Sequence, residues 1–161
     1  MDVSQIFILT GAISASALTV LALLHRPRTL PQWAFVCGLL MTALEGYLQF
    51  LSLRSVAFEQ MMFWQRLAAF PVAAFPLVWL VFSLTYARGN ATVFVQSAIS
   101  QILLVGGLPL LLVSLTWRVM ITDAEWFDGP GHWRFPVTAY GLALRWLLLI
   151  GLILTLAHLE R

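Results

Sequence analysis

Five small or polar residues recur along one apolar stretch of this sequence, between residues 32 and 53. They are Gly38, Thr42, Glu45, Gln49 and Ser52, at spacings of four, three, four and three. This periodicity places all five on one face of a helix, which we call the polar stripe. Lipid cannot satisfy such groups, so we expect the polar stripe to face protein or water.

Two arginines are candidate partners for the Glu45 carboxyl group. Arg145 follows Thr138 and Gly141 on one face of another apolar run. At 1.5 Å per residue, Glu45 and Arg145 both lie roughly 13–15 Å from the outer surface. An unpaired charge at that depth costs several kcal/mol, so a Glu45–Arg145 ion pair is predicted. Arg66 is the competing partner, although its long side chain can also snorkel to the interface.

This predicted intramembrane polar centre has two interpretations. Polar side chains commonly hold transmembrane helices together, so these residues could set only register and packing. Alternatively, they form a ligand- or proton-sensing site in the outer half of the bundle, since intramembrane charges are functional candidates. The residues assigned to the centre are Glu45, Arg145, Arg66, Gln49 and Thr42.

Residues typical of catalysis or cofactor binding are sparse. His25 and His158 fall at one end of their predicted helices and His132 in a loop at the other, so no two of them match a transmembrane haem site. The single Cys37 forms no internal disulfide, and no Cys/His spacing resembles a metal site. There is no nucleophile–base pair and no phosphate-binding loop. We expect no catalytic residue, metal or cofactor in this chain.

The composition determines which elements position these residues. Of the 161 residues, 61% are hydrophobic and only 10% are charged, and the mean hydropathy is +0.90. A soluble domain carries about 25% charged residues, so the natural solvent of this chain is lipid. The net charge of +2 lacks the clustered basic face that binds nucleic acid. We predict an all-α fold, a polytopic transmembrane helix bundle forming one membrane domain over 1–161.

Charge and proline clusters separate five apolar runs, each close to or above the ~20 residues needed to cross a bilayer. The start of the chain has an acid and no basic residue, so the first run is expected to be a retained helix, not a signal peptide. The long polar segment 118–134 is the predicted outer loop, with tryptophans suited to the interface. The predicted helices span about 6–24, 32–53, 61–86, 93–117 and 136–158.

The arginines predict the orientation. The first loop holds two arginines and no acid, and early helices often dominate orientation. We therefore expect the N-terminus outside and the C-terminus in the cytoplasm. The cytoplasmic arginines would be Arg26, Arg28, Arg88 and Arg161, and the outer ones Arg54, Arg118 and Arg134.

Prolines and glycines interrupt two of the predicted helices. Pro71 and Pro76 lie inside 61–86, and Gly106, Gly107 and Pro109 lie inside 93–117. Each proline removes a backbone donor and should kink or loosen its helix. These residues either give the bundle a static shape or act as hinges that transmit a signal.

Three segments resemble a known family. Phe63-Trp64-Gln65-Arg66-Leu67 and the run from Phe75-Pro76 to Tyr86-Ala87-Arg88-Gly89 are similar to the N-terminal multi-helix membrane region of bacterial sensor histidine kinases. The segment 152–161, ending in Leu159-Glu160-Arg161, resembles the junction after a leucine-rich helix in the histidine kinases of the PEP-CTERM/exosortase system (PrsK type).

This resemblance implies an input region in the bacterial inner membrane, part of a sensor of seven or eight helices. Further helices, often a GAF-like module, and a cytoplasmic core that binds ATP and Mg would follow. It also implies a homodimer that signals to a response regulator through that core. This chain contains no phospho-acceptor histidine box and no nucleotide-binding motif. The end at Leu159-Glu160-Arg161, at a helix terminus, is expected of a fragment.

The alternative is a small stand-alone membrane protein that binds a partner or assists assembly. A transporter half is less favoured, because transporters show inverted repeats and broken helices at the midplane. A coding frame that continues past Arg161 into a kinase core would distinguish the first hypothesis from the second.

Overall fold

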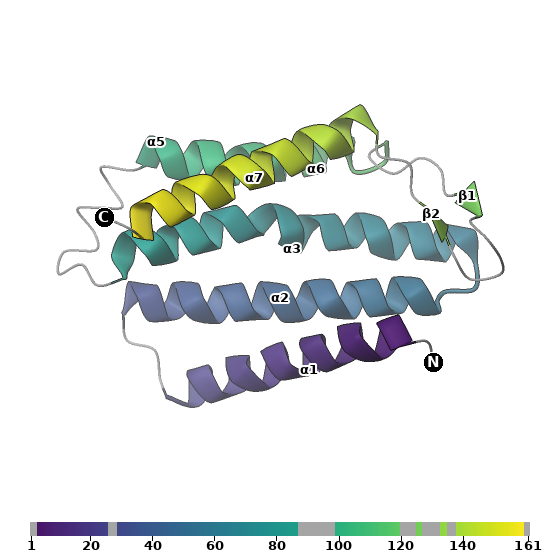
Figure 1. Ribbon diagram of the computed structural model, residues 1–161, viewed down its shortest axis with the longest axis horizontal. Helices are drawn as coiled ribbons and strands as arrows, with labels where there is room; N and C mark the ends of the chain where they lie inside the picture. The colour runs from purple at the N-terminus through teal and green to yellow at the C-terminus, as the bar shows by residue number, and fades with distance from the viewer. Residues whose placement is uncertain are drawn as a thin grey trace.

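The chain forms an all-helical bundle, seen in a computed structural model that describes residues 3–25, 29–86, 99–119, 125–126, 133–134 and 138–159. Among the described residues, five helices are long and apolar enough to cross a membrane, so the chain is a multi-pass membrane protein and the predicted fold class is confirmed. The spans are α1 (Val3–Leu24), α2 (Leu30–Arg54), α3 (Phe58–Thr85), a composite fourth helix, and α7 (Ala139–Leu159) (Figure 1).

Helices α2 and α7 start two and three residues from the predicted positions, because local capping determines their starts. Before α2, the Thr29 N–H donates to Gln32 Oε1 at 3.2 Å, and Pro31 occupies the first turn. Before α7, the Thr138 hydroxyl accepts the Gly141 N–H at 3.2 Å, so the helix begins at Ala139 rather than 136. Residues 93–98 and 136–137 of the predicted helices lie outside the described residues.

The fourth span consists of three segments: α5 (Ile99–Ile102), the π-helical turn η1 (Leu103–Gly107) and α6 (Leu108–Thr116). The π-turn falls at the predicted weak point, Gly106-Gly107 followed by Pro109. Proline cannot donate to the carbonyl four residues earlier, and π-turns occur where the regular helical ladder is interrupted.

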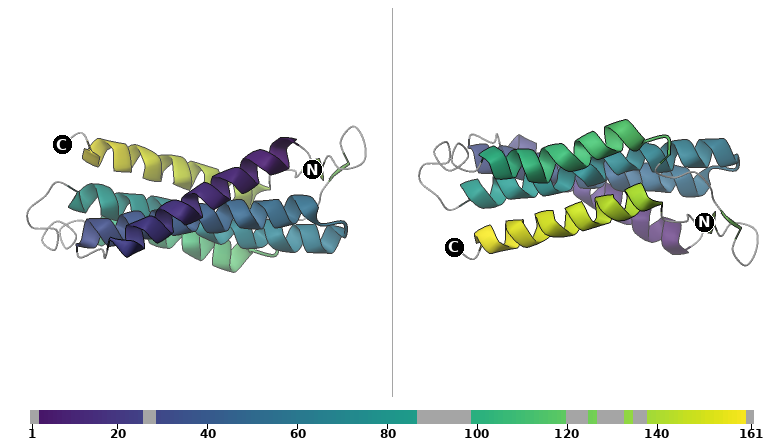
Figure 2. Two further views of the ribbon diagram at one scale, coloured as in Figure 1. Left: turned by 90° about the horizontal axis from the view of Figure 1, so that it is seen from below. Right: turned by 90° about the horizontal axis from the view of Figure 1, so that it is seen from above.

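Helix α3 lies at the centre of the bundle. It packs on α2 along one side and on α7, α6 and η1 along the other, while α1 packs along α2 (Figures 1 and 2). Two small cores connect α3 to the C-terminal helices. One contains Ala73, Val113 and Leu144, and the other contains Leu80, Leu84 and Val105.

The predicted outer loop contains a short antiparallel strand pair, which was not predicted from the sequence. Strand β1 (Glu125–Trp126) pairs with β2 (Trp133–Arg134) in the register Glu125↔Arg134. Figure 1 shows this pair at the same end of the bundle as the N-terminus, with the C-terminus at the opposite end. Five crossings require that arrangement, since each crossing moves the chain from one end of the bundle to the other. The remainder of 120–132 lies outside the described residues.

Candidate functional site

Two members of the polar stripe, Gly38 and Ser52, lie against α3, whereas Thr42 is exposed. At one end, a Cβ added to Gly38 would lie 3.2 Å from the Trp79 ring. At the other end, the Ser52 hydroxyl donates to the Met61 carbonyl oxygen at 3.4 Å. Glu45 lies seven residues from each, and two helical turns return a side chain to nearly the same face. Glu45 therefore also points toward α3.

Glu45 has its hydrogen-bond partner within α2. The Gln49 side-chain Nε2 donates to Glu45 Oε1 at 2.6 Å, and both side chains are half-buried. The Thr42 hydroxyl donates to the Gly38 carbonyl at 2.9 Å, so it forms an intrahelical bond and does not bridge to another helix. Much of the polar stripe is thus satisfied within α2 itself.

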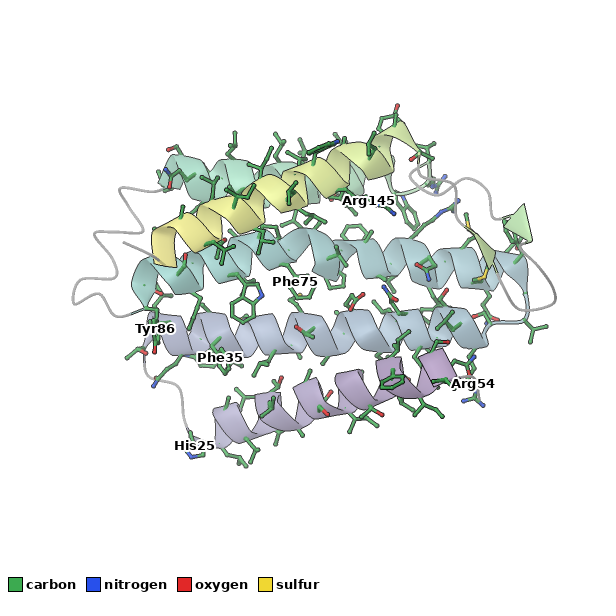
Figure 3. The ribbon with its side chains drawn as sticks, in the orientation of Figure 1. His25, Phe35, Arg54, Phe75, Tyr86 and Arg145 are labelled. Atoms are coloured by element: carbon green, nitrogen blue, oxygen red, sulfur yellow. The ribbon has the colours of Figure 1, made fainter. Side chains whose placement is uncertain are left out.

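The predicted Glu45–Arg145 ion pair is not formed. Arg145 is exposed on α7, which packs on α3 and α6. Figure 3 shows Arg145 on α7, with α3 lying between it and α2. Sequence spacing gave the two groups a similar depth, but depth alone does not determine which helices are neighbours in the membrane plane.

Arg66, the competing partner, lies on the other side of α3. It precedes Ala69 by three residues and Ala73 by seven, and both alanines belong to the contact with Val113 and Leu144. Residues at these spacings share one helical face. Half-buried Arg66 is therefore on the α3 face toward α6 and α7, while Glu45 lies against the opposite face.

The level of Glu45 coincides with a proline of α3. Glu45 is midway between Gly38, which contacts Trp79, and Ser52, which contacts Met61. The midpoint of Met61 and Trp79 is residue 70, so Glu45 on α2 falls at about the level of Pro71 on α3. The structure thus brings the polar stripe and one predicted hinge residue to the same depth.

Two other predicted hinge residues, Gly106 and Pro76, lie at close contacts between α3 and the C-terminal helices. A Cβ on Gly106 would lie 2.5 Å from Leu77 Cβ. A Cβ on Gly151 would lie 2.6 Å from Pro76 Cβ. Gly151 was not identified from the sequence, although a glycine in an otherwise apolar helix can indicate close helix packing. Gly107 has no atom within 4 Å of an added Cβ, and Pro109 is buried.

Four aromatic residues pack together where the N-terminal end of α2 meets the C-terminal end of α3. Phe35 of α2 lies 6.4 Å from Trp79 and 6.0 Å from Phe82 between ring centroids. Phe82 stacks on Tyr86 at 5.0 Å, and Figure 3 labels Phe35 and Tyr86 at this end. Aromatic pairs at such separations each contribute about 0.5–1.5 kcal/mol beyond area burial.

Neither a catalytic nor a metal constellation is found where the structure describes the chain. Over those residues, no three His, Cys, Asp or Glu side chains are placed to hold a metal ion. Cys37 is exposed, and His25 is exposed with Nδ1 2.8 Å from the Leu21 carbonyl oxygen. His132 and the side chain of His158 lie outside the described part.

Comparison with known proteins identified no relative. No family model, no curated protein and no solved structure matches this chain.

Proposed function

We propose that this chain is the membrane-embedded sensory region of a two-component histidine kinase, of the type found in the PEP-CTERM/exosortase system. In this proposal it lies in the bacterial inner membrane with its N-terminus outside. It passes a signal to a cytoplasmic kinase core that binds ATP and Mg and phosphorylates a response regulator. The parent protein would act as a homodimer. The proposal starts from the family resemblance of segments 63–67, 75–89 and 152–161.

The observation that carries the proposal is the position of the Glu45–Gln49 pair beside Pro71. A polar group inside the membrane is costly, so a change in its hydrogen bonding or protonation changes the energy of the neighbouring helix contact. Pro71 and Pro76 remove two backbone donors from α3, which weakens the helix at that level. A change at Glu45 would therefore act on the most deformable part of the adjacent helix.

Helix α3 itself links this level to the C-terminal helix. Pro76 lies five residues from Pro71 and contacts α7 at Gly151. Helix α7 then runs to Leu159, the end from which a kinase core would continue. Small shifts of packed helices are an established way to transmit a signal. Arg145 and Arg66 lie on the α7 side of α3, so they would bias the same contact from the opposite face.

The test uses the full-length protein in nanodiscs with ATP and Mg, and measures autophosphorylation of the kinase core. We expect Glu45→Gln to shift the autophosphorylation rate, because the amide cannot become charged. Thr42→Val is the matched control on the same stripe, since Thr42 bonds only to its own helix. Arg145→Leu tests the α7 side separately.

Unchanged autophosphorylation in both Glu45→Gln and Arg145→Leu would exclude a signalling role for this centre. A stop codon directly after Arg161 in the coding frame would exclude the kinase proposal as a whole. It would favour the stand-alone partner-binding protein.

A further inference from the structure

An apolar groove runs between α3 and α7, and neither the polar stripe nor the proposed signalling path accounts for it. Its volume is about 390 Å³, and its lining includes Phe75, Pro76 and Trp79 from α3 and Leu152, Thr155 and Leu156 from α7. All of its lining residues lie within membrane-spanning segments, so the groove opens to lipid rather than to water. We propose that it binds one hydrocarbon tail of a membrane lipid.

The chemistry of the walls favours a hydrocarbon occupant. Nearly all lining side chains are hydrocarbon, and the one hydroxyl, that of Thr155, already donates to the Gly151 carbonyl at 2.8 Å. Only the indole N–H of Trp79 remains as a side-chain donor. A phosphate, a carboxylate or a sugar requires several partners when it leaves water, and this groove does not supply them.

The size and direction of the groove match an acyl chain. Its lining extends from Leu148 to Leu156 on α7, eight residues or roughly 12 Å along the helix axis. Its volume is about 390 Å³. The groove therefore has room for a segment of one tail, and it runs along the helices as lipid tails do.

A helix from a second copy fits the groove less well. Helices approach closely in membranes through small residues at the interface. The small residue here, Gly151, is already used, because a Cβ on it would lie 2.6 Å from Pro76 Cβ. The rim carries large side chains, including Leu152 and Leu156, which are 54% and 52% exposed. A thin, flexible chain can enter between them, whereas a helix would be held away.

The experiment uses the whole chain in phosphatidylcholine nanodiscs containing a trace of phosphatidylcholine with a diazirine in one acyl chain. After irradiation and digestion, mass spectrometry measures the lipid adducts at each residue. Leu156→Trp fills the groove. Ile153→Trp is the matched control, since Ile153 is on α7, is 56% exposed and does not line the groove. Circular dichroism checks that both variants keep their helices.

We expect labelling at Leu152 to exceed labelling at the equally exposed Ile153, and labelling at half-buried Phe75 to exceed it as well. Labelling at these two groove residues should fall severalfold in Leu156→Trp and stay unchanged in Ile153→Trp. Labelling that follows exposure alone, or that Leu156→Trp leaves intact, would overturn the proposal. The molar mass from light scattering gives a second check. If Leu156→Trp, but not Ile153→Trp, converted a dimer into a monomer, a second copy would occupy the groove and the proposal would be overturned. Neither result depends on the proposed kinase role.

Discussion

At the scale of single residues, the central feature is a carboxyl group inside an apolar bundle with its partner one helical turn away. Gln49 donates to Glu45 at 2.6 Å, and the pair lies against α3 near Pro71. Arg66 and Arg145 both lie on the side of α3 that faces away from α2. The side-chain amide of Gln49 is therefore the group that donates a hydrogen bond to the Glu45 carboxyl group. Side-chain hydrogen bonds between membrane helices contribute about 0.6 kcal/mol on average and at most about 1.7 kcal/mol, which bounds the scale of this bond within α2.

The first prediction concerns this hydrogen bond. Gln49→Leu should lower the free energy of unfolding by about 0.6–1.7 kcal/mol, because it leaves the Glu45 carboxyl group without its donor. The measurement is unfolding of the purified chain by sodium dodecyl sulfate in mixed micelles, followed by circular dichroism. Glu45→Gln is the matched control and should stay near the parent stability, since its amide oxygen still accepts from Gln49. Equal losses in the two variants would show that this bond does not stabilise the fold.

At the scale of elements, α3 packs on η1 and α7 through contacts that require glycine. Gly106 of η1 lies against Leu77, and Gly151 of α7 lies against Pro76. The two α3 residues in these contacts, Pro76 and Leu77, are adjacent in the sequence, so both contacts fall at one level of α3. The π-turn sets the position of Gly106 on this face, since its wider turn rotates the following residues relative to a regular helix.

The second prediction follows from the two adjacent glycines of η1. Gly106→Ala should cost about 1–3 kcal/mol of stability, because the new Cβ would lie 2.5 Å from Leu77 Cβ and the helices must move apart. Gly107→Ala meets nothing within 4 Å and should be neutral or slightly stabilising. Thermal unfolding in detergent measures both. A similar effect of the two substitutions would contradict the close contact at Gly106.

At the scale of the whole molecule, the five spanning helices of the described residues place the two chain ends on opposite faces of the membrane. The strand pair of the loop that follows α6 shares the face of the N-terminus (Figure 1). In the plane of the membrane, α1 and α2 lie on one side of α3, and α6 and α7 lie on the other. Orientation rests on the arginine bias of the loops.

The third prediction tests that orientation. Single cysteines are introduced by Ser4→Cys or Arg161→Cys in a Cys37→Ala background, since Cys37 is the only native thiol. With the N-terminus outside, a membrane-impermeant maleimide added to spheroplasts should label the cysteine at position 4. The cysteine at position 161 should react only after the membrane is opened. The opposite labelling pattern would reverse the predicted orientation.

The sequence by itself determined the class of the fold, the five spans and the polar face of α2. Span length and the scarcity of charge are local properties, and each can be read without knowing any neighbour. Helical periodicity is also local, and it placed Gly38 and Ser52 on the face of α2 that meets α3, whereas Thr42 of the same stripe is exposed. That face had to meet protein, because lipid offers no hydrogen bonds.

Only the tertiary structure decided which helix the polar stripe meets. Apolar helices pack in several lateral orders with similar hydrophobic energy, because lipid tails compete equally for their surfaces. The order is selected by shape: Gly38 admits Trp79, Gly106 admits Leu77 and Gly151 admits Pro76. Those contacts place α3 between α2 and α7. They separate Glu45 from Arg145, which sequence spacing had placed at the same depth.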